Sequence, residues 1–253
     1  MPVHQPRLAE IVAGRLRERI VSGELGNGGQ LPRQEELMEE YGVGKPAMRE
    51  ALRALEIEGL ITIRRGNRGG AIVHPPQVRN AAYAVGLVLH SRRVLMSDLR
   101  EAVMSIEPVC AGLCAAREDR HEAVLPDLRE AHERAVAHVD DELKHTQASR
   151  DFHELLVRHC GNQTLILVVG ALESLWSERE LAWARDATGG GPFPDPSGRQ
   201  QGLDDHARML ELIEAGDVDG VQQEARAHLN FSPNFARDDR FEHTVDVPAP
   251  PRP

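Results

Sequence analysis

Two histidines, His206 and His228, are spaced so that they could bind a metal ion together. His206 opens one expected helix and His228 lies near the end of the next. Gly216-Asp217 is the expected turn between the two helices, because glycine commonly ends a helix and aspartate commonly begins one. Two antiparallel helices of this length bring both imidazoles to the same end of the pair. Because imidazole binds zinc and nickel well, the spacing predicts a candidate metal site in the C-terminal part of the chain.

A third histidine, His153, lies within an earlier expected helix. His159 follows six residues later and points to another face of that helix, which makes it a poor partner. Cys110 and Cys114 lie one helical turn apart, and we interpret them as small core residues rather than as redox or metal groups. Four further histidines lie on polar stretches and are expected to face solvent: His121, His132, His138 and His145.

The elements that would position these histidines are expected to be helices. After residue 76, Leu-, Ala-, Glu- and Arg-rich stretches alternate with short breaks and show no strand pattern. The Gly/Pro-rich stretch 188–198 is expected to be the longest internal loop, and the polar, Pro-rich stretch 232–253 a flexible tail. An all-helical bundle is therefore predicted over 80–231, with helices near 80–91, 97–117, 121–139, 142–160, 163–186, 202–215 and 217–230.

The first 76 residues have a different pattern. An amphipathic helix is expected over 8–21, a second from Pro32 to about Tyr41, and a third from Pro46 to Gly59. Two short β-branched stretches then flank an Arg/Gly turn, which is a hairpin signal. Three helices and a hairpin within this length describe a winged helix-turn-helix over 1–76. The fold class is thus mainly α, with this domain at the front and the helical bundle behind it.

The third helix of the winged domain carries a row of basic residues. Met48 and Leu52 would pack in the core, while Lys45 and Arg49 recur on a neighbouring face. These two lie in the first turns, which are the part of a recognition helix that reaches base edges in the major groove. Arg49 could bond a guanine or grip a phosphate, and the helix N-terminus itself favours phosphate. Three arginines on the wing could enter the minor groove or touch the DNA backbone: Arg64, Arg65 and Arg68.

Charge and hydropathy narrow the class of protein. The chain has a net charge of −10, but residues 1–80 hold 12 Lys/Arg and 10 Asp/Glu (+2), and residues 81–253 hold 18 and 30 (−12). This asymmetry is compatible with DNA contact at one end only. The apolar runs are too short to span a bilayer, and no secretory signal precedes the first helix. We therefore expect a cytoplasmic protein without a membrane partner.

The stretch SGELGNGGQLPRQEELMEEYGVGKPAMREALRALEIEGLI (22–61) resembles the winged helix of GntR-family transcriptional regulators. The match runs in order through Leu31-Pro32, Tyr41-Gly42-Val43 and Arg49-Glu50-Ala51-Leu52. An arginine that contacts DNA is frequent in the family at the position of Glu35, and Arg33 is the candidate to replace it. The resemblance and the basic row together name the expected DNA-contacting residues as Arg33, Lys45, Pro46, Ala47, Arg49, Arg64, Arg65 and Arg68.

Residues 80–231 resemble the FadR-type, FCD-like effector domain of the same family. The matching features are Glu107-Pro108, Phe152-His153 with Gly161-Asn162, and then His206 and Ala227-His228-Leu229. In many such domains three histidines and an aspartate bind a divalent metal that holds a carboxylate effector. The resemblance therefore implies a zinc or nickel site at His153, His206 and His228.

The chain departs from that family pattern at two positions. The aspartate expected four residues before His153 is Ser149, which leaves three histidines to hold the metal and makes the site more cationic. An arginine frequent before the Glu-Pro pair is Val103, and Arg100, one turn earlier, could compensate. The expected ligand-binding set is therefore Ser149, Arg100, His153, His206 and His228.

Three functions remain open from the residues. The favoured one is a homodimeric regulator that binds a palindromic operator and senses an effector in a histidine-lined cavity that could hold a metal; the resemblance implies that it is a repressor. Val103 weakens the case for a small hydroxy acid and leaves room for a larger or more apolar effector. A second is a metal-free regulator of the same build that senses an acyl thioester or lipid-like effector. A third, a metal-dependent enzyme, is disfavoured because no nucleophile elbow and no glutamate base at motif spacing accompany the histidines.

Overall fold

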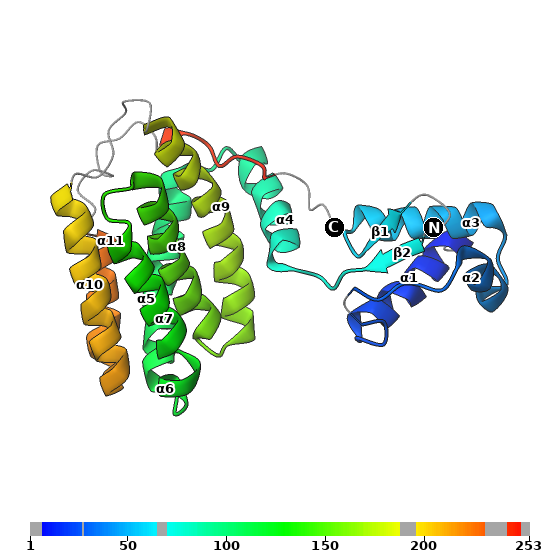
Figure 1. The fold of residues 1–253 in the computed structure, drawn as a ribbon. Helices are drawn as coiled ribbons and strands as arrows, with labels where there is room; N and C mark the ends of the chain where they lie inside the picture. The colour runs from blue at the N-terminus through cyan, green and yellow to red at the C-terminus, as the bar shows by residue number, and fades with distance from the viewer. Residues whose placement is uncertain (1–6, 27, 65–69, 188–195, 231–241, 249–253) are drawn as a thin grey trace, which may run out of the picture. The chain divides into compact units, whose positions relative to one another are not determined.

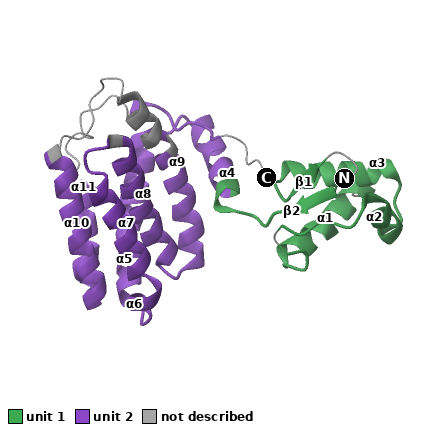
Figure 2. Ribbon diagram, in the orientation of Figure 1, with its two compact units in different colours: residues 1–80, 249–253 green, residues 81–248 purple. Residues whose placement is uncertain are grey.

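The computed structural model describes residues 7–26, 28–64, 70–187, 196–230 and 242–248 (Figure 1). These residues form two compact units, the first ending at residue 80 and the second spanning 81–248 (Figure 2). The division falls in the first turn of helix α4 (Val78–Ser91), a few residues after the expected domain boundary at residue 76. Each unit has its own apolar core.

Unit 1 is a winged helix-turn-helix, as predicted. Gly42 ends the second helix with φ +63°, and Gly59 follows the third with φ +72°, conformations that cost glycine little. Pro46 lies in the first turn of the third helix, where no helical partner awaits its missing N–H. The elements are α1 (Leu8–Val21), α2 (Gln34–Tyr41), α3 (Lys45–Ile57), β1 (Ile61–Arg64) and β2 (Gly70–Val73).

The two strands of unit 1 form the antiparallel wing. Ile61 pairs with Val73 and Arg64 with Gly70, and both Ile61 and Val73 are buried. The tip of the wing, 65–69, lies outside the described residues, and the expected DNA contacts Arg65 and Arg68 lie there with it. The core beneath the wing is aliphatic and includes Val12, Leu16, Ile20, Leu37, Met48, Leu52, Leu55 and Leu60.

Unit 2 is an all-helical bundle, as predicted. Two of its helices, α5 and α11, pack closely at Gly112, where an added Cβ would lie 2.4 Å from Nε2 of Gln222 and that side chain would have to move. Leu, Val and Ala side chains with Phe152 and Met209 fill the core. Besides α4, the helices are α5 (Met96–Ala116), α6 (Arg120–Ala123), α7 (Leu125–Ala137), α8 (Glu142–His159), α9 (Gln163–Ala187), α10 (Pro196–Ala215) and α11 (Val218–Asn230).

Three segments of unit 2 differ from the expectation. The helix expected over 121–139 is divided at Val124 into α6 and α7. Helix α10 begins at Pro196, inside the stretch 188–198 that the sequence predicts as a loop, and proline fits the first helical turn. The rest of that expected loop, 188–195, lies outside the described residues. The third segment, 242–248, belongs to the stretch that the sequence predicts as a flexible tail. It instead pairs with the connection between α4 and α5, where Thr244 forms an antiparallel bridge with Leu95 and Val245 is buried.

No helix in the described parts of the chain is both long enough and apolar enough to cross a membrane.

Candidate metal centre and nucleic-acid interface

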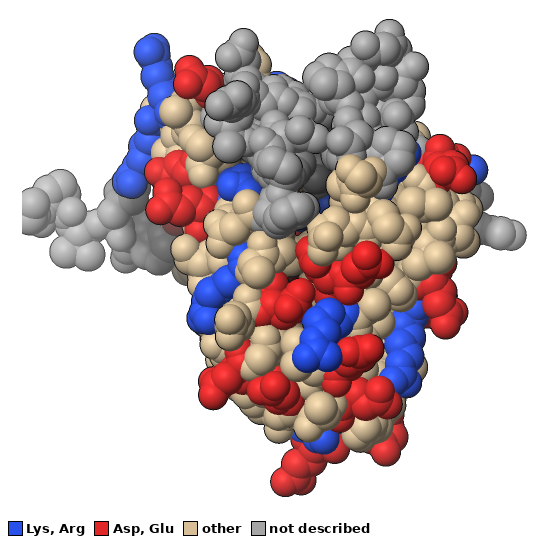
Figure 3. Space-filling model, turned by 90° about the vertical axis from the view of Figure 1, so that its left-hand side faces the viewer, with Lys and Arg blue, Asp and Glu red and all other residues tan. Residues whose placement is uncertain are grey.

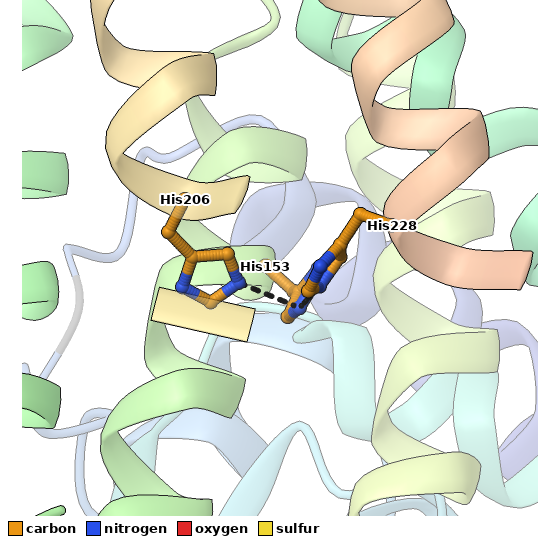
Figure 4. Close-up of side chains that lie close together, drawn as sticks. All are labelled: His153, His206 and His228. Atoms are coloured by element: carbon orange, nitrogen blue, oxygen red, sulfur yellow. Dashed lines mark hydrogen bonds between the residues drawn. The ribbon is translucent and has the colours of Figure 1, made fainter. Parts of the chain in front are cut away.

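Three histidines from three helices meet inside unit 2 (Figure 4). His153 comes from the middle of α8, His206 from α10 and His228 from the last turn of α11. The Nε2 atom of His153 lies 3.4 Å from Nε2 of His206 and 3.4 Å from Nε2 of His228. The structure therefore brings together the set that the sequence resemblance implied.

Two carboxylates hold two of these rings from behind. Nδ1–H of His153 donates to Oε1 of Glu107 on α5, at 2.5 Å. Nδ1–H of His228 donates to Oδ2 of Asp205, at 3.0 Å. A proton fixed on Nδ1 leaves Nε2 with a lone pair, so both rings present a donor atom to the shared space. This carboxylate–histidine arrangement is the one that orients imidazoles in metal sites.

His206 is held by packing rather than by a carboxylate. Its ring stacks on Phe152, with centroids 4.1 Å apart and planes 11° apart. It is buried, and its Nδ1 has no hydrogen-bond partner among the described residues. Burial and the neighbouring His228 and His153 lower the pKa of His206 well below its usual value. The ring is therefore neutral at neutral pH, which is the form that binds a metal.

A buried ionic cluster lies behind His153. Arg150 of α8 forms an ion pair with Glu173 of α9 and also donates to Ser177. Burial raises the pKa of Glu107, and burial raises the pKa of Glu173 to about 7. At Asp205, burial raises the pKa, but hydrogen bonds from His228 and Gln201 outweigh it, so the net shift is downward. Asp205 therefore stays ionised opposite His228.

The three imidazoles fit a divalent ion of the zinc type. Their ligand atoms all lie within 4.8 Å of one another. In a tetrahedral site with zinc–nitrogen bonds of about 2.1 Å, two ligand nitrogens lie about 3.4 Å apart. Two of the pairs here have that separation. Among the described residues, the buried thiols of Cys110, Cys114 and Cys160 do not belong to such a group.

The other expected ligand-binding residues lie near the histidines without joining them. Ser149 is half-buried on α8, one turn before His153. Nη2 of Arg100 donates to the carbonyl of Leu229 at 2.7 Å, so this guanidinium reaches the end of α11 beside His228. His159 pairs with Asp127 and lies outside the group, as predicted.

The expectation that four other histidines face solvent was wrong for His145. It is buried, and its Nδ1 donates to the carbonyl of Ala135 at 3.1 Å. His132 is half-buried, and its ring lies edge-on to His206 with centroids 6.4 Å apart. Burial lowers the pKa of both rings. Both lie on helix faces that turn inward toward the bundle although their neighbours in sequence are polar.

The sequence did not predict the two carboxylates that hydrogen-bond to the histidine group. Asp205 precedes His206 but pairs with His228, and only the register of α10 against α11 creates that contact. Glu107 belongs to the Glu-Pro pair of the family resemblance, but its hydrogen bond to His153 joins two helices that lie far apart in the sequence. A buried carboxylate in an otherwise apolar stretch is the one local signal that could have marked Glu107.

The basic row of α3 is exposed in unit 1. Lys45, Pro46 and Arg49 are exposed, and Ala47 is half-buried. The opposite face of the helix packs in the core through Met48 and Leu55. Among the described residues, neither Lys45 nor Arg49 forms an ion pair. Their charges are therefore available to an external anion.

Two further expected DNA contacts flank the row. Arg33 is exposed at the N-terminus of α2, where its backbone N–H donates to Glu36. Arg64 is exposed at the end of β1. Unit 2 contrasts with this basic head, because acidic side chains are spread over its face that carries α10, with fewer basic ones between them (Figure 3).

Comparison with known proteins identifies both units. Residues 8–70 match the bacterial regulatory proteins of the gntR family, and residues 98–231 match the FCD domain. The FCD match covers more than half of the chain. The chain belongs to the GntR family, in its FadR-type group. Members of this family are transcriptional regulators, so the chain is a regulator and not an enzyme.

Individual relatives agree with this assignment. The chain is 46% identical to the transcriptional repressor NanR of Klebsiella aerogenes over 67 residues, which cover 26% of each protein. It is 27% identical to NanR of Citrobacter rodentium over 235 residues, or 90% of this chain and 85% of that protein. The match to NanR of Klebsiella aerogenes therefore spans about a quarter of that protein's length. A GntR structure from Streptococcus agalactiae shares the fold, with a TM-score of 0.68 and 22% identity over 88% of this chain and 97% of that one.

Proposed function

We propose that this GntR-family regulator is a homodimeric repressor that binds a palindromic operator and releases it in response to an organic acid bound at the histidine group. One observation carries the proposal: a single chain holds an exposed Lys45–Arg49 row in one unit and three converging imidazoles in the other. The NanR relatives are repressors, which supports the direction of the response.

On the DNA side, α3 would enter the major groove. Arg49 would bond a base edge, while Lys45 and the α3 N-terminus would contact phosphate. Arg33, Arg64, Arg65 and Arg68 would add backbone or minor-groove contacts. One winged helix makes few phosphate contacts, and a two-fold dimer doubles them and sets the half-site spacing.

On the sensing side, His153, His206 and His228 would hold a zinc or nickel ion. When bound, the ion supplies a Lewis acid that can hold a carboxylate oxygen. Ser149 stands where the resemblance implies an aspartate, so no side-chain anion of that kind neutralises the ion. The positive charge of the site then favours an anionic effector. Asp205 places its negative charge one layer further out, behind the ring of His228, and the carboxyl group of Glu107 lies behind the ring of His153.

The response requires that the effector bind the two conformations of the regulator with different affinity. A tenfold change in operator affinity needs a difference of about 1.4 kcal/mol in effector binding between them. A single bond between the effector carboxylate and the ion would be enough for a difference of this size if it formed in one conformation only.

The decisive experiment combines three measurements on the purified protein. Metal analysis should find about one zinc or nickel per chain, removable by a chelator. DNA selected by the protein from fragments of its own genome should contain a palindrome, and light scattering should give a dimer. Absence of metal, with DNA selection retained, would favour the metal-free regulator of an acyl thioester. Absence of any sequence preference would remove the regulator proposal.

Replacement of Glu107 by glutamine should weaken zinc binding by about tenfold, because carboxylates behind metal-bound histidines orient the rings and raise their basicity. The amide keeps the shape of the carboxylate but removes its charge. Competition for zinc with a coloured chelator measures the effect. Glu101→Gln, on the same helix, is the matched control and should leave zinc affinity unchanged. Equal affinity in Glu107→Gln and wild type would show that the carboxylate has no part in the site.

A further inference from the structure

The segment 242–248 is docked on unit 2 as a short strand. The N–H of Met96 donates to the carbonyl of His243 at 2.9 Å, and the N–H of Val245 donates to the carbonyl of Val94 at 2.9 Å. Between these bonds Thr244 lies opposite Leu95 in an antiparallel bridge. The Val245 side chain is 1% exposed. Two backbone bonds and a buried valine give this segment a defined place.

The same segment holds α4. His90, in the last turn of α4, donates from Nδ1 to the carbonyl of Val245 at 2.8 Å. Pro248 lies against Gly86, where an added Cβ would be 2.6 Å from the proline Cδ and 3.1 Å from Leu175. Gly86 thus allows the α4 backbone to approach the proline ring closely. The segment contacts α4 at two points, one turn apart.

A third attachment joins the segment to α9. Arg179 of α9 forms an ion pair with Asp246 at 3.0 Å. The aspartate is 67% exposed in its side chain, so this pair adds little stability by itself. The pair nevertheless places the segment next to α9, so that the segment contacts both α9 and α4.

Within the part of the chain that the structure describes, α4 has few other contacts that hold it. Its buried residues are Ala82 and Gly86, which bring little apolar area, whereas Leu87 and Val88 are 44% and 49% exposed. The chain passes from unit 1 into unit 2 through this helix. In the sequence, the docked segment follows α11, which carries His228. The linker helix α4 is therefore held by residues 242–248, which follow the His228-bearing helix α11 in the sequence.

We propose that residues 242–248 act as a strap that fixes the linker helix α4 to unit 2. A strapped α4 holds the point where the chain enters unit 2 in one place on that unit, and a released α4 lengthens the linker that leads to unit 1. The consequence of the strap for DNA binding rests on the proposed function. Once one DNA-binding unit of a dimer is bound, a looser linker lowers the effective concentration of the second unit at its half-site, so the palindrome is bound more weakly.

Hydrogen exchange in the full-length chain tests the strap directly. Val245→Asp places a charge in a buried position and should release the segment. Amides of residues 82–91 should then exchange about tenfold faster, since local opening becomes easier, while those of α8 and α10 keep their wild-type rates. Val136→Asp is the matched control, because Val136 is 47% exposed on α7. Fast exchange at Thr244 and Val245 with unchanged exchange in α4 would overturn the proposal.

A disulfide variant covers the case in which Val245→Asp unfolds unit 2. Leu95 and Thr244 face each other between the two bonds, a position where cross-strand Cα atoms lie about 4.5 Å apart and a disulfide is feasible. Oxidation of Leu95→Cys/Thr244→Cys should slow exchange in α4 by about threefold or more relative to the reduced protein. Equal rates in the two forms would overturn the strap.

Operator binding separates this proposal from the proposed function. With a DNA fragment selected by the wild-type protein, the released form should bind about fivefold more weakly, and the oxidised disulfide form should bind as well as wild type. Unchanged affinity in the released form would overturn the strap's role in DNA binding. If the wild type selects no DNA, the proposed function fails, and the exchange experiment still decides whether the strap holds α4.

Discussion

Replacement of His228 by alanine should reduce zinc affinity by about 100-fold or more while DNA binding without zinc stays at the wild-type level. The change removes one of three nitrogen donors that the structure brings within 4.8 Å. Loss of a carboxylate behind a ligand already costs 10- to 100-fold in known sites, and loss of the ligand itself costs at least as much. Chelator competition measures zinc affinity, and fluorescence anisotropy measures DNA binding.

The variant should remain folded. Removal of the ring leaves Oδ2 of Asp205 without its partner, a cost of about 1–3 kcal/mol for a buried acceptor. Nε2 of Gln201 still donates to the other carboxylate oxygen at 2.7 Å, so the aspartate keeps one bond. Unit 1 has a separate core and is not touched by the change. Thermal unfolding should therefore show a modest shift rather than loss of structure.

His159→Ala is the control for this experiment. His159 is the same residue type on the same unit, but it pairs with Asp127 outside the histidine group. Its replacement should leave zinc affinity unchanged. If His228→Ala and His159→Ala bind zinc equally well, the histidine group is not the metal site. If the effector response survives in His228→Ala, sensing does not depend on the group.

The elements of both units were predictable because local rules agree with the final packing. Periodic apolar residues bury one face of each helix, and Gly42, Gly59 and Gly216 stop helices where a positive φ is needed. Pro46 could be placed in a first turn on the same grounds. The meeting of His206 and His228 followed from one tight turn between two helices of similar length, which is a local geometry.

Features that depend on register between distant segments could not be predicted. The pairing of Asp205 with His228 needs the rotation of α10 against α11, and the burial of His145 needs the rotation of α8 against its neighbours. Composition misled at the tail, where polar and Pro-rich residues suggested disorder. Val245 docks there because the N–H of Met96 and the carbonyl of Val94, in the connection between α4 and α5, need hydrogen-bond partners. Sequence patterns within the tail do not reveal these distant groups.

Replacement of Arg49 by alanine should weaken binding to the selected operator by about 100-fold. Arg49 is exposed in the second turn of α3, the region of a recognition helix that reaches base edges. A good contact from arginine to guanine contributes about 1–3 kcal/mol of discrimination, and a dimer makes it twice. Because the side chain is exposed, the melting temperature should not change.

The salt dependence of binding separates a base contact from a phosphate contact. Each phosphate contact contributes about 0.9 to the slope of log affinity against log salt concentration. Lys45→Ala should lower that slope by about one per protomer and weaken all DNA sequences alike, whereas Arg49→Ala should flatten the preference for the operator over random DNA. Arg53→Ala, one turn beyond Arg49 and also exposed, should have a smaller effect on both quantities. Wild-type discrimination in Arg49→Ala would mean that another side chain reads the operator, and Arg33 and the wing would be the next residues to replace.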